Sequence, residues 1–230
     1  MYLIELSDYS LKSTGTGNSL KNFYFTLSNG DICSIQTDST DDAGNFLKAL
    51  ATLVRPVNGA YRFMGEAISF ADYRKLLPLK KKIGYIGQDS AMISNITVRE
   101  NLLLMRCYFE NSLSLVLDEN ASRFCKMFNL QDKLDVRPGD LRPVDLRIAI
   151  AIRELTKSFD VLLLERPEDY FGYNRFTLFK EILRDIVEPG PALVFFSRDR
   201  DFIETFSNMK ILITGGALTK VPKNNHGTRL

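Results

Sequence analysis

The sequence predicts an α/β protein whose largely parallel β-sheet is covered by helices on both faces. Two short, wholly apolar runs, residues 161–164 and 192–196, have the composition of strands that are buried on both sides, as is typical of parallel sheets. They alternate with longer segments in which apolar residues recur at helical spacing. This alternation favours one main sheet packed between helices.

The remaining elements follow from apolar periodicity and from turn-forming residues between the periodic segments. The turns SNGD at 28–31 and Asn58-Gly59 separate strands, and Arg55-Pro56 closes the first helix. The strands are predicted at 2–6, 22–27, 32–36, 60–63, 82–86, 161–164, 192–196, 210–213 and 217–221. The helices are predicted at 43–54 and 73–77, as several helices within 97–153, around 176–186, and at 201–207.

We predict a single domain over residues 1–221, followed by a polar tail at 222–230. Its middle part, from about residue 89 to about 155, begins as a loop of small polar residues and continues as three helical patterns, TVRENLLLMRCYF, ASRFCKMFNL and DLRIAIAIREL. This middle part is predicted to form a helical subdomain with a small core of its own.

The overall composition narrows the classes of function. A formal charge of +2, without a concentrated basic face, gives no case for a nucleic-acid partner. The three cysteines are scattered in apolar surroundings, which predicts buried thiols in a reducing compartment and neither disulfides nor a metal site. The start of the chain lacks the pattern of a signal peptide, and no apolar run is long enough to span a bilayer. A cytoplasmic protein is therefore expected.

A strand, a tight polar turn and a helix at 31–54 have the arrangement that binds a nucleotide phosphate. Free amide groups and the positive end of the dipole make the start of such a helix favourable for an anion. A working phosphate loop also places glycines in the turn and a lysine at the start of the helix. Here the turn carries Asp38, Asp41 and Asp42, and no Lys or Arg lies between Lys21 and Lys48. The segment therefore has the predicted backbone arrangement of a phosphate loop but lacks the residues that bind a phosphate.

Several segments resemble, in order, those of the ATP-binding subunits of ABC transporters. IGYIGQDSAMISNITVRENLLL, residues 83–104, resembles their Q-loop region, with Gln88 at the glutamine. VLLLERPEDYF, from Val161, resembles their Walker B strand, and RPVNGAYRFMGEAI, from Arg55, resembles their β subdomain. The resemblance covers about residues 2–220. It implies a P-loop NTPase (RecA-like) core with an antiparallel β subdomain and a helical subdomain, and it implies ATP and magnesium as cofactors on that ground alone.

The phosphate loop departs from the pattern of this family. The resemblance places Ala43 at the phosphate-binding lysine and Gly44 at the hydroxyl that ligates magnesium, so a cation and a metal ligand are lost. Each added carboxylate would repel a triphosphate by about 1 kcal/mol or more. Two alternatives stay open, that the aspartates cap the helix or that they hold a cation. The degenerate loop consists of Thr37, Asp38, Ser39, Thr40, Asp41, Asp42, Ala43, Gly44 and Asn45.

The catalytic motifs differ from the family pattern as well. Glu165 stands where the family has the magnesium-binding Asp, and Arg166 replaces the catalytic Glu. An arginine cannot act as a general base at neutral pH. Arg198 takes the place of the switch histidine, and the only histidine of the chain is His226 in the tail. No catalytic residue is therefore predicted, only these degenerate equivalents.

The signature LSGGQ of the family corresponds here to LRPVD. In the family this loop caps the γ-phosphate of a partner subunit with backbone N–H groups, and Pro143 has no N–H to offer. An alternative is that Arg142 or Arg166 holds a phosphate from another direction. The degenerate signature residues are Leu141, Arg142, Pro143, Val144 and Asp145.

The other positions of interest have a structural and a functional interpretation. The aromatic residue that stacks on adenine in the family falls near Ser13, with Tyr9 as a competing position. Gln88 either links two subdomains by hydrogen bonds or couples them functionally. Glu165 and Arg166 are expected to pair with neighbouring charges.

The leading hypothesis is a degenerate ATP-binding subunit, a pseudo-ATPase. It would form a homodimer, or a heterodimer with an active homologue, and would dock on a membrane permease at the cytoplasmic face of a membrane. A lipid-transport system is one guess at its setting. The first alternative is a nucleotide-binding ABC ATPase with residual hydrolysis, and the second is a soluble regulatory adaptor with an ABC-like fold.

Overall fold

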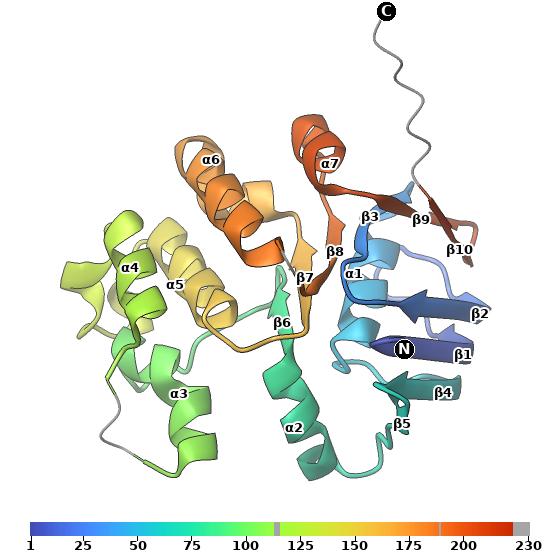
Figure 1. Ribbon diagram of the computed structural model, residues 1–230, viewed down its shortest axis with the longest axis horizontal. Helices are drawn as coiled ribbons and strands as arrows, with labels where there is room; N and C mark the ends of the chain where they lie inside the picture. The colour runs from blue at the N-terminus through green and yellow to red at the C-terminus, as the bar shows by residue number, and fades with distance from the viewer. Residues whose placement is uncertain (113–115, 189, 223–230) are drawn as a thin grey trace, which may run out of the picture.

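The computed structural model describes residues 1–112, 116–188 and 190–222. Two β-sheets and seven α-helices are assigned within these ranges (Figure 1). The strands are β1 (Ile4–Leu11), β2 (Leu20–Leu27), β3 (Ile32–Thr37), β4 (Asn58–Phe63), β5 (Glu66–Ala67), β6 (Ile83–Ile86), β7 (Val161–Glu165), β8 (Ala192–Phe196), β9 (Met209–Thr214) and β10 (Ala217–Pro222). The helices are α1 (Thr40–Leu50), α2 (Tyr73–Lys82), α3 (Val98–Glu110), α4 (Glu119–Met127), α5 (Pro143–Leu155), α6 (Pro167–Val187) and α7 (Arg200–Phe206).

The larger sheet has six strands in the order β10-β9-β3-β8-β7-β6. The strands from β9 to β6 pair in parallel, and β10 pairs antiparallel with β9. The second sheet, β2-β1-β4-β5, is antiparallel throughout. The predicted α/β class, with a largely parallel sheet and a separate antiparallel one, is confirmed.

Apolar packing forms two clusters on opposite faces of the six-stranded sheet. One joins α1 to both sheets through buried residues such as Phe46, Leu50 and Tyr61. The other packs α4, α5, α6 and α7 on the opposite face, around Phe171, Phe179 and other residues. Helices α3, α4 and α5 lie together at one end of the molecule, and the antiparallel sheet lies at the other (Figure 1).

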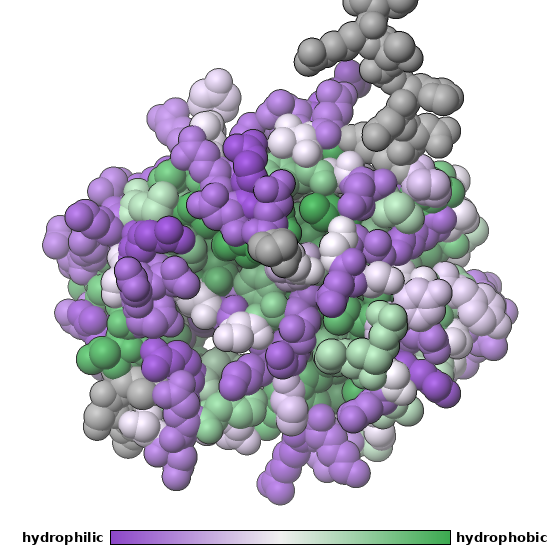
Figure 2. Space-filling view, viewed as in Figure 1, coloured by the Kyte–Doolittle hydropathy of each residue, from purple (hydrophilic) through white to green (hydrophobic). Residues whose placement is uncertain are grey.

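The surface in this view is largely hydrophilic. Figure 2 shows hydrophobic residues between hydrophilic ones, mainly toward the middle of the face. Within the described ranges, no helix has both the length and the apolar character that a membrane crossing requires.

Two helix ends differ from the prediction. Helix α1 stops at Leu50 and does not reach Val54, because Thr52 takes a left-handed backbone conformation (φ 57°) that ends the helix. Leu53, which falls within the predicted helix 43–54, consequently lies after its end and is 53% exposed. Helix α2 continues past the predicted end at residue 77 to Lys82, and its Leu76 and Leu79 are both buried.

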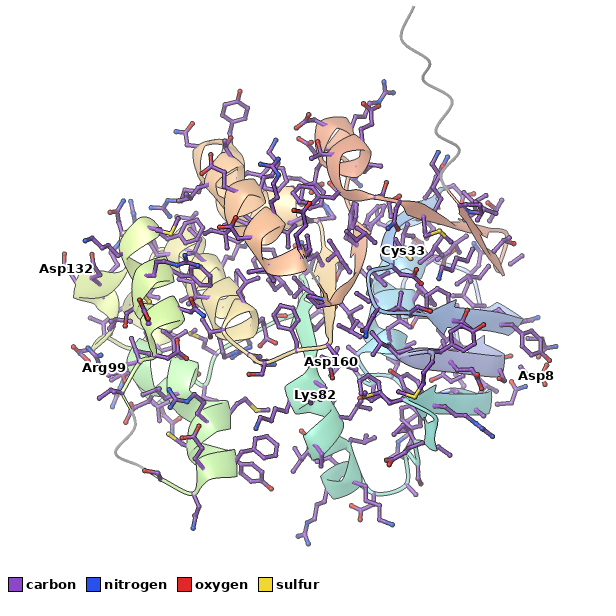
Figure 3. The ribbon with its side chains drawn as sticks, in the orientation of Figure 1. Asp8, Cys33, Lys82, Arg99, Asp132 and Asp160 are labelled. Carbon is purple, nitrogen blue, oxygen red and sulfur yellow. The ribbon has the colours of Figure 1, made fainter. Side chains whose placement is uncertain are left out.

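Strands β6 and β7 are aligned at their starts by a polar contact between their neighbours. Lys82 and Asp160 lie close together in Figure 3, with Nζ of Lys82 3.3 Å from Oδ2 of Asp160. The Asp160 amide also donates to the Lys82 carbonyl at 2.8 Å. These contacts help to align β6 with β7, so that the residues at the carboxyl ends of both strands lie at the same edge of the sheet.

The cysteine thiols are free. Burial raises the pKa of Cys33, on β3, to about 12 and that of Cys125 to about 11. Thiols of that kind are poor nucleophiles. Cys107 is only partly buried, so the prediction of buried thiols holds for two of the three.

Candidate functional site

A cavity of about 360 Å³ lies where the predicted phosphate loop meets the ends of β6 and β7. Its wall includes Thr40 and Gly44 from the start of α1, Gln88 after β6, and Glu165 and Arg166 at the end of β7. Carboxyl ends of parallel strands converge at one edge of a sheet, which is where α/β proteins place ligands. The structure therefore brings the predicted phosphate loop, Q-loop and Walker B position together.

Helix α1 is capped by Ser39 and not by an aspartate. The Ser39 Oγ accepts a hydrogen bond from the Asp42 amide at 3.3 Å, and Ser39 has the extended backbone of an N-cap residue. Asp41 and Asp42 lie in the first turn of the helix. The alternative that the aspartates supply the cap is therefore wrong.

The two first-turn aspartates bind the loop between β1 and β2. One Asp41 carboxylate oxygen accepts from the Thr16 amide at 2.8 Å and from the Thr16 hydroxyl at 3.0 Å. The Asp42 carboxylate, on a residue only 1% exposed, accepts from the Asn18 amide at 2.6 Å and from its side-chain amide at 3.0 Å. The hydrogen bonds from Thr16 lower the pKa of Asp41. Negative charge is thus placed at the start of α1, in the segment that the family resemblance predicts as a phosphate loop.

Ala43, which the family resemblance places at the phosphate-binding lysine, is part of the core. Ala43 is 0% exposed and belongs to the apolar cluster between the two sheets. The neighbouring Gly44 faces the Glu165 carboxylate, and a Cβ on Gly44 would lie 2.8 Å from Glu165 Oε1. The longer acidic side chain occupies the space that a hydroxyl-bearing side chain would need. The changes at residues 44 and 165 are therefore sterically complementary.

Glu165 is held by neutral donors. Its Oε2 accepts from the Tyr85 hydroxyl at 3.0 Å and from the Gln88 amide at 3.2 Å. The Gln88 side chain donates to the Glu165 carbonyl at 3.2 Å. Burial, together with the nearby carboxylate, raises the pKa of Tyr85, so its hydroxyl stays a donor. Gln88 therefore acts in this structure as a link between the loop after β6 and the end of β7. The expected charge pair for Glu165 is not found within the part of the chain that the structure describes.

Arg166 forms the charge pair that was expected for it. It contacts Asp169 in the first turn of α6, and its backbone is left-handed (φ 52°, ψ 60°). The Arg166 amide donates to the Phe196 carbonyl at 2.7 Å, which fixes this strained residue at the sheet edge. Its Nε is buried and has no hydrogen-bond partner among the described residues. A guanidinium so placed cannot remove a proton from water.

The charges around the cavity do not suit a magnesium triphosphate. The carboxylates of Asp41, Asp89 and Glu165 line it. Its two cations, Lys48 and Arg166, are paired with Asp89 and Asp169. Among the described residues, no three or more His, Cys, Asp or Glu side chains form a group that could hold a metal ion. The residues present therefore do not fit the ATP and magnesium that the family resemblance implies.

The degenerate signature lies outside this cavity, at the start of α5. Arg142 is the N-cap residue, without a side-chain cap bond, and Pro143 opens the helix. Asp145, 1% exposed, accepts from Lys133 at 2.8 Å, Arg142 at 2.8 Å and Arg175 at 3.2 Å. Burial by itself raises the pKa of Asp145, but these three cations outweigh it and hold the pKa well below 3.8.

Two further predicted positions are placed elsewhere. Arg198 follows β8 and lines a separate cavity of about 430 Å³ with Thr37 and Asp38. Its amide donates to Glu168 at 2.8 Å, while its side chain is exposed. Tyr9 is 0% exposed, so it presents no free ring to stack on a base.

Several residues that complete these hydrogen-bond networks were not predicted from the sequence. Thr16 and Asn18 from the β1–β2 loop, Tyr85 on β6, and the cations Lys133 and Arg175 were not predicted as site residues. For the loop the available signal was Gly15 and Gly17, since both pack directly against the Asp41 or Asp42 side chains. For the others the contacts span long sequence separations without a local motif.

Comparison with known proteins agrees with this architecture. The chain is 26% identical over 190 residues to the macrolide export ATP-binding/permease protein MacB of Campylobacter jejuni, which covers 82% of the chain and 29% of that protein. It is 24% identical over 222 residues to the xylose import ATP-binding protein XylG of Shigella flexneri, covering 94% of the chain and 42% of that protein. The chain thus spans less than half the length of these relatives. No protein-family model matches it.

Solved structures give the same result for the fold. A dimeric bacterial ABC transporter cassette superposes with a TM-score of 0.79 at 19% identity, covering 95% of this chain and 98% of that one. A post-hydrolysis state of that cassette, bound to ADP and phosphate, superposes with a TM-score of 0.78. The chain therefore has the fold of an ATP-binding cassette, and it is similar in sequence to the ATP-binding parts of the two transport proteins named above.

Proposed function

We propose that this chain is a catalytically silent ABC subunit, which docks on a membrane permease and supports transport without hydrolysing ATP itself. One observation carries the proposal. The chain's own carboxylates, from Asp41, Asp42 and Glu165, stand at positions that the family resemblance assigns to the binding of phosphates and magnesium, and each is already bound by groups of the protein. A triphosphate would have to displace these bonds and would then meet like charge.

The means to activate water are also lacking. The position that needs a general base holds Arg166, and the switch position holds Arg198, so neither accepts a proton at neutral pH. The helix that would present N–H groups to a partner's nucleotide opens with Pro143, which has none. We therefore expect two defects in a dimer. The chain lacks a base in its own site, and it also lacks a donor for the nucleotide of its partner.

A groove next to the site supports docking. It has a volume of about 440 Å³ and lies between the end of α1, α2, β6 and the end of α5. Leu53 and Tyr85 give it apolar walls. Its four cations, Lys48, Lys80, Arg153 and Lys157, outnumber its two carboxylates, Asp89 and Glu154, although all of the cations but Lys80 are paired with one of these carboxylates. Such a groove suits a short amphipathic helix that carries an acidic residue. Lys48 and Asp89 line both this groove and the cavity of about 360 Å³ at the start of α1, which we call the phosphate cavity. A partner bound in the groove would therefore contact the wall between the groove and the phosphate cavity.

The similarities point to the same setting. MacB and XylG are described as export and import proteins with ATP-binding parts, and the superposed cassette is a dimer. We therefore propose that the chain works as a homodimer, or as a heterodimer with an active cassette, on the cytoplasmic face of a membrane. The middle part, residues 89–155, is then the helical subdomain that faces the permease together with the Q-loop.

The test measures nucleotide binding and turnover. Purified protein is titrated with a fluorescent ATP analogue in the presence of magnesium, and phosphate release is followed with unlabelled ATP. We expect neither saturable micromolar binding nor release above a no-protein control. Tight binding together with turnover that is lost in Glu165→Ala would instead establish the first alternative, an ATPase with residual activity.

Docking is tested by co-purification from native membranes. A Leu53→Asp variant places a charge in the groove and should lose the permease subunits that the wild type retains. The matched control is Tyr173→Asp, because Tyr173 is 93% exposed on α6 and lies outside the groove. A wild-type preparation without any membrane protein would contradict docking and would favour the soluble adaptor.

A further inference from the structure

The loop between β1 and β2, residues 12–19, crosses the start of α1 and is called the strap here. Thr14 and Gly15 of the strap form part of the wall of the phosphate cavity. Most strap residues are exposed to solvent, yet the strap is held to the rest of the protein at several points. It is therefore bound against the start of α1 and is not a free surface loop.

Four points anchor the strap. At its start the Asn45 side chain donates to the Lys12 carbonyl at 2.8 Å. In the middle Thr16 and Asn18 donate to the first-turn carboxylates of α1, as described above. At its end the Ser19 carbonyl lies against Gly216, in the turn between β9 and β10, where a Cβ would not fit. Three of the four anchors thus come from, or lead to, the first two turns of α1.

The direction of these bonds is the reverse of that in a phosphate site. In a phosphate site, amide groups at the start of a helix donate to an anion that the ligand brings. Here the helix itself carries the anions, on Asp41 and Asp42, and the amides that donate to them belong to the strap. The charge that favours the start of a helix is therefore supplied from within the chain.

The strap is shaped for this contact. A Cβ on Gly15 would overlap the Asp41 carboxylate, and a Cβ on Gly17 would overlap the Asp42 carboxylate. Gly15 also has a positive φ of 55°, which other residues rarely adopt. Glycine at both positions lets the strap backbone approach the two carboxylates to hydrogen-bond distance.

We propose that the strap is an internal latch at the start of α1, in which Asp41 and Asp42 hold the strap in place of a nucleotide's phosphates. The latched strap ties the antiparallel sheet to the core without any ligand. This inference goes beyond the loss of hydrolysis, because it names a contact within the chain that would have to open before a phosphate could bind at the start of α1.

Hydrogen exchange of the Thr16 and Asn18 amides tests the latch directly, since these protons are donated to the two carboxylates. Gly17→Ala should force the strap off Asp42 without changing the charge of the protein. Asp41→Ala combined with Asp42→Ala should release the strap by removing both acceptors. In each variant we expect exchange of the two amides to accelerate about tenfold or more, while the amides of β8 stay protected.

The matched control is Asp38→Ala. Asp38 is an exposed aspartate of the same turn, and the hydrogen bonds from Thr16 and Asn18 go to Asp41 and Asp42 instead. It removes one charge but should leave exchange of the strap amides unchanged. Equal acceleration in the control would show that charge alone acts, and unchanged exchange in Gly17→Ala would show that no latch exists. Either result overturns the proposal.

A second measurement separates this inference from the proposed function. Adding magnesium and ATP to the wild type should not alter exchange at Thr16 and Asn18, because Asp41 and Asp42 already bind these amides at the start of α1. Protection or release of these amides by ATP would overturn the latch even if no hydrolysis occurs. Phosphate release by the wild type with the strap amides unaffected would refute the silent-subunit proposal alone, because the nucleotide would then bind without opening the latch.

Discussion

The Glu165 carboxylate faces Gly44 so closely that a side chain on Gly44 would meet it, with 2.8 Å between a Cβ on Gly44 and Glu165 Oε1. Gly44 lies inside α1, where glycine is unfavourable relative to alanine. The acidic side chain cannot simply move away, because Tyr85 and Gln88 hold it. The glycine in the helix is thus explained by its neighbour on β7.

This pair predicts an energetic coupling. Gly44→Ala should stabilise a Glu165→Asp protein by about 1 kcal/mol, through helix propensity, because the shorter side chain leaves room. In the wild-type background Gly44→Ala should raise the free energy of unfolding by about 1 kcal/mol less than it does in Glu165→Asp, since the new side chain pushes Glu165 away from Tyr85. Denaturant unfolding of the four proteins of this cycle measures the difference. Additive effects would mean that the contact carries no energy.

Restoring the lysine alone should not restore hydrolysis. Ala43→Lys introduces a charged chain at a fully buried position, so we expect the free energy of unfolding to fall by about 2 kcal/mol or more. Phosphate release should stay at background, because Arg166 and Arg198 still stand at the positions of the base and the switch. The comparison variant is Ala43→Val, which is apolar at the same position. Turnover by Ala43→Lys would contradict the view that several independent losses silence the site.

The buried Asp145 should matter more for stability than any one of its partners. Asp145→Asn leaves three cations around a neutral group and should cost about 3 kcal/mol in unfolding free energy. Arg142→Ala should cost less than about 1 kcal/mol, because the Arg142 side chain is 67% exposed and two other cations remain. Thermal or denaturant unfolding compares the two. Similar losses would show that the cluster is no more than a surface ion pair.

The same residue predicts a dependence of stability on pH. The pKa of Asp145 is lower in the folded protein than its ordinary value of 3.8, because Lys133, Arg142 and Arg175 stabilise the charged form against the opposing effect of burial. Its contribution is therefore complete above the ordinary value and is lost as the pH falls below it. The stability gap between wild type and Asp145→Asn should narrow between about pH 5 and about pH 3. A gap that stays constant would contradict the lowered pKa.

Much of the fold was predictable from local patterns. The apolar strands 161–164 and 192–196 are interior strands of the six-stranded sheet, because only a strand covered on both faces tolerates such a run. Helix ends were less predictable. The end of α1 depends on one left-handed residue, Thr52, which has no distinctive local sequence signal.

For the candidate site, the sequence predicted which residues are missing but not which contacts replace them. The absence of lysine, glycines and a general base can be seen in the letters around Ala43 and Arg166. That the aspartates would hold the β1–β2 loop, and not cap α1, was not visible, because Asp41 and Thr16 are 25 positions apart. Capping is a local interaction, whereas this one needs the antiparallel sheet to bring the loop to the helix.

The sequence by itself determined the class of the fold, the order of its elements and the residue types that a phosphate site would lack. It did so because apolar periodicity and motif spacing are local properties of the chain. Only the tertiary structure decided what replaced the missing chemistry. Glu165 against Gly44, the strap on Asp41 and Asp42, and the three cations on Asp145 all join segments that are distant in the chain or were not predicted to meet. The packing of two sheets around α1 brings Glu165 to Gly44 and the strap to the two aspartates. The buried charge of Asp145 requires partners of opposite charge, and only the folded chain brings them together.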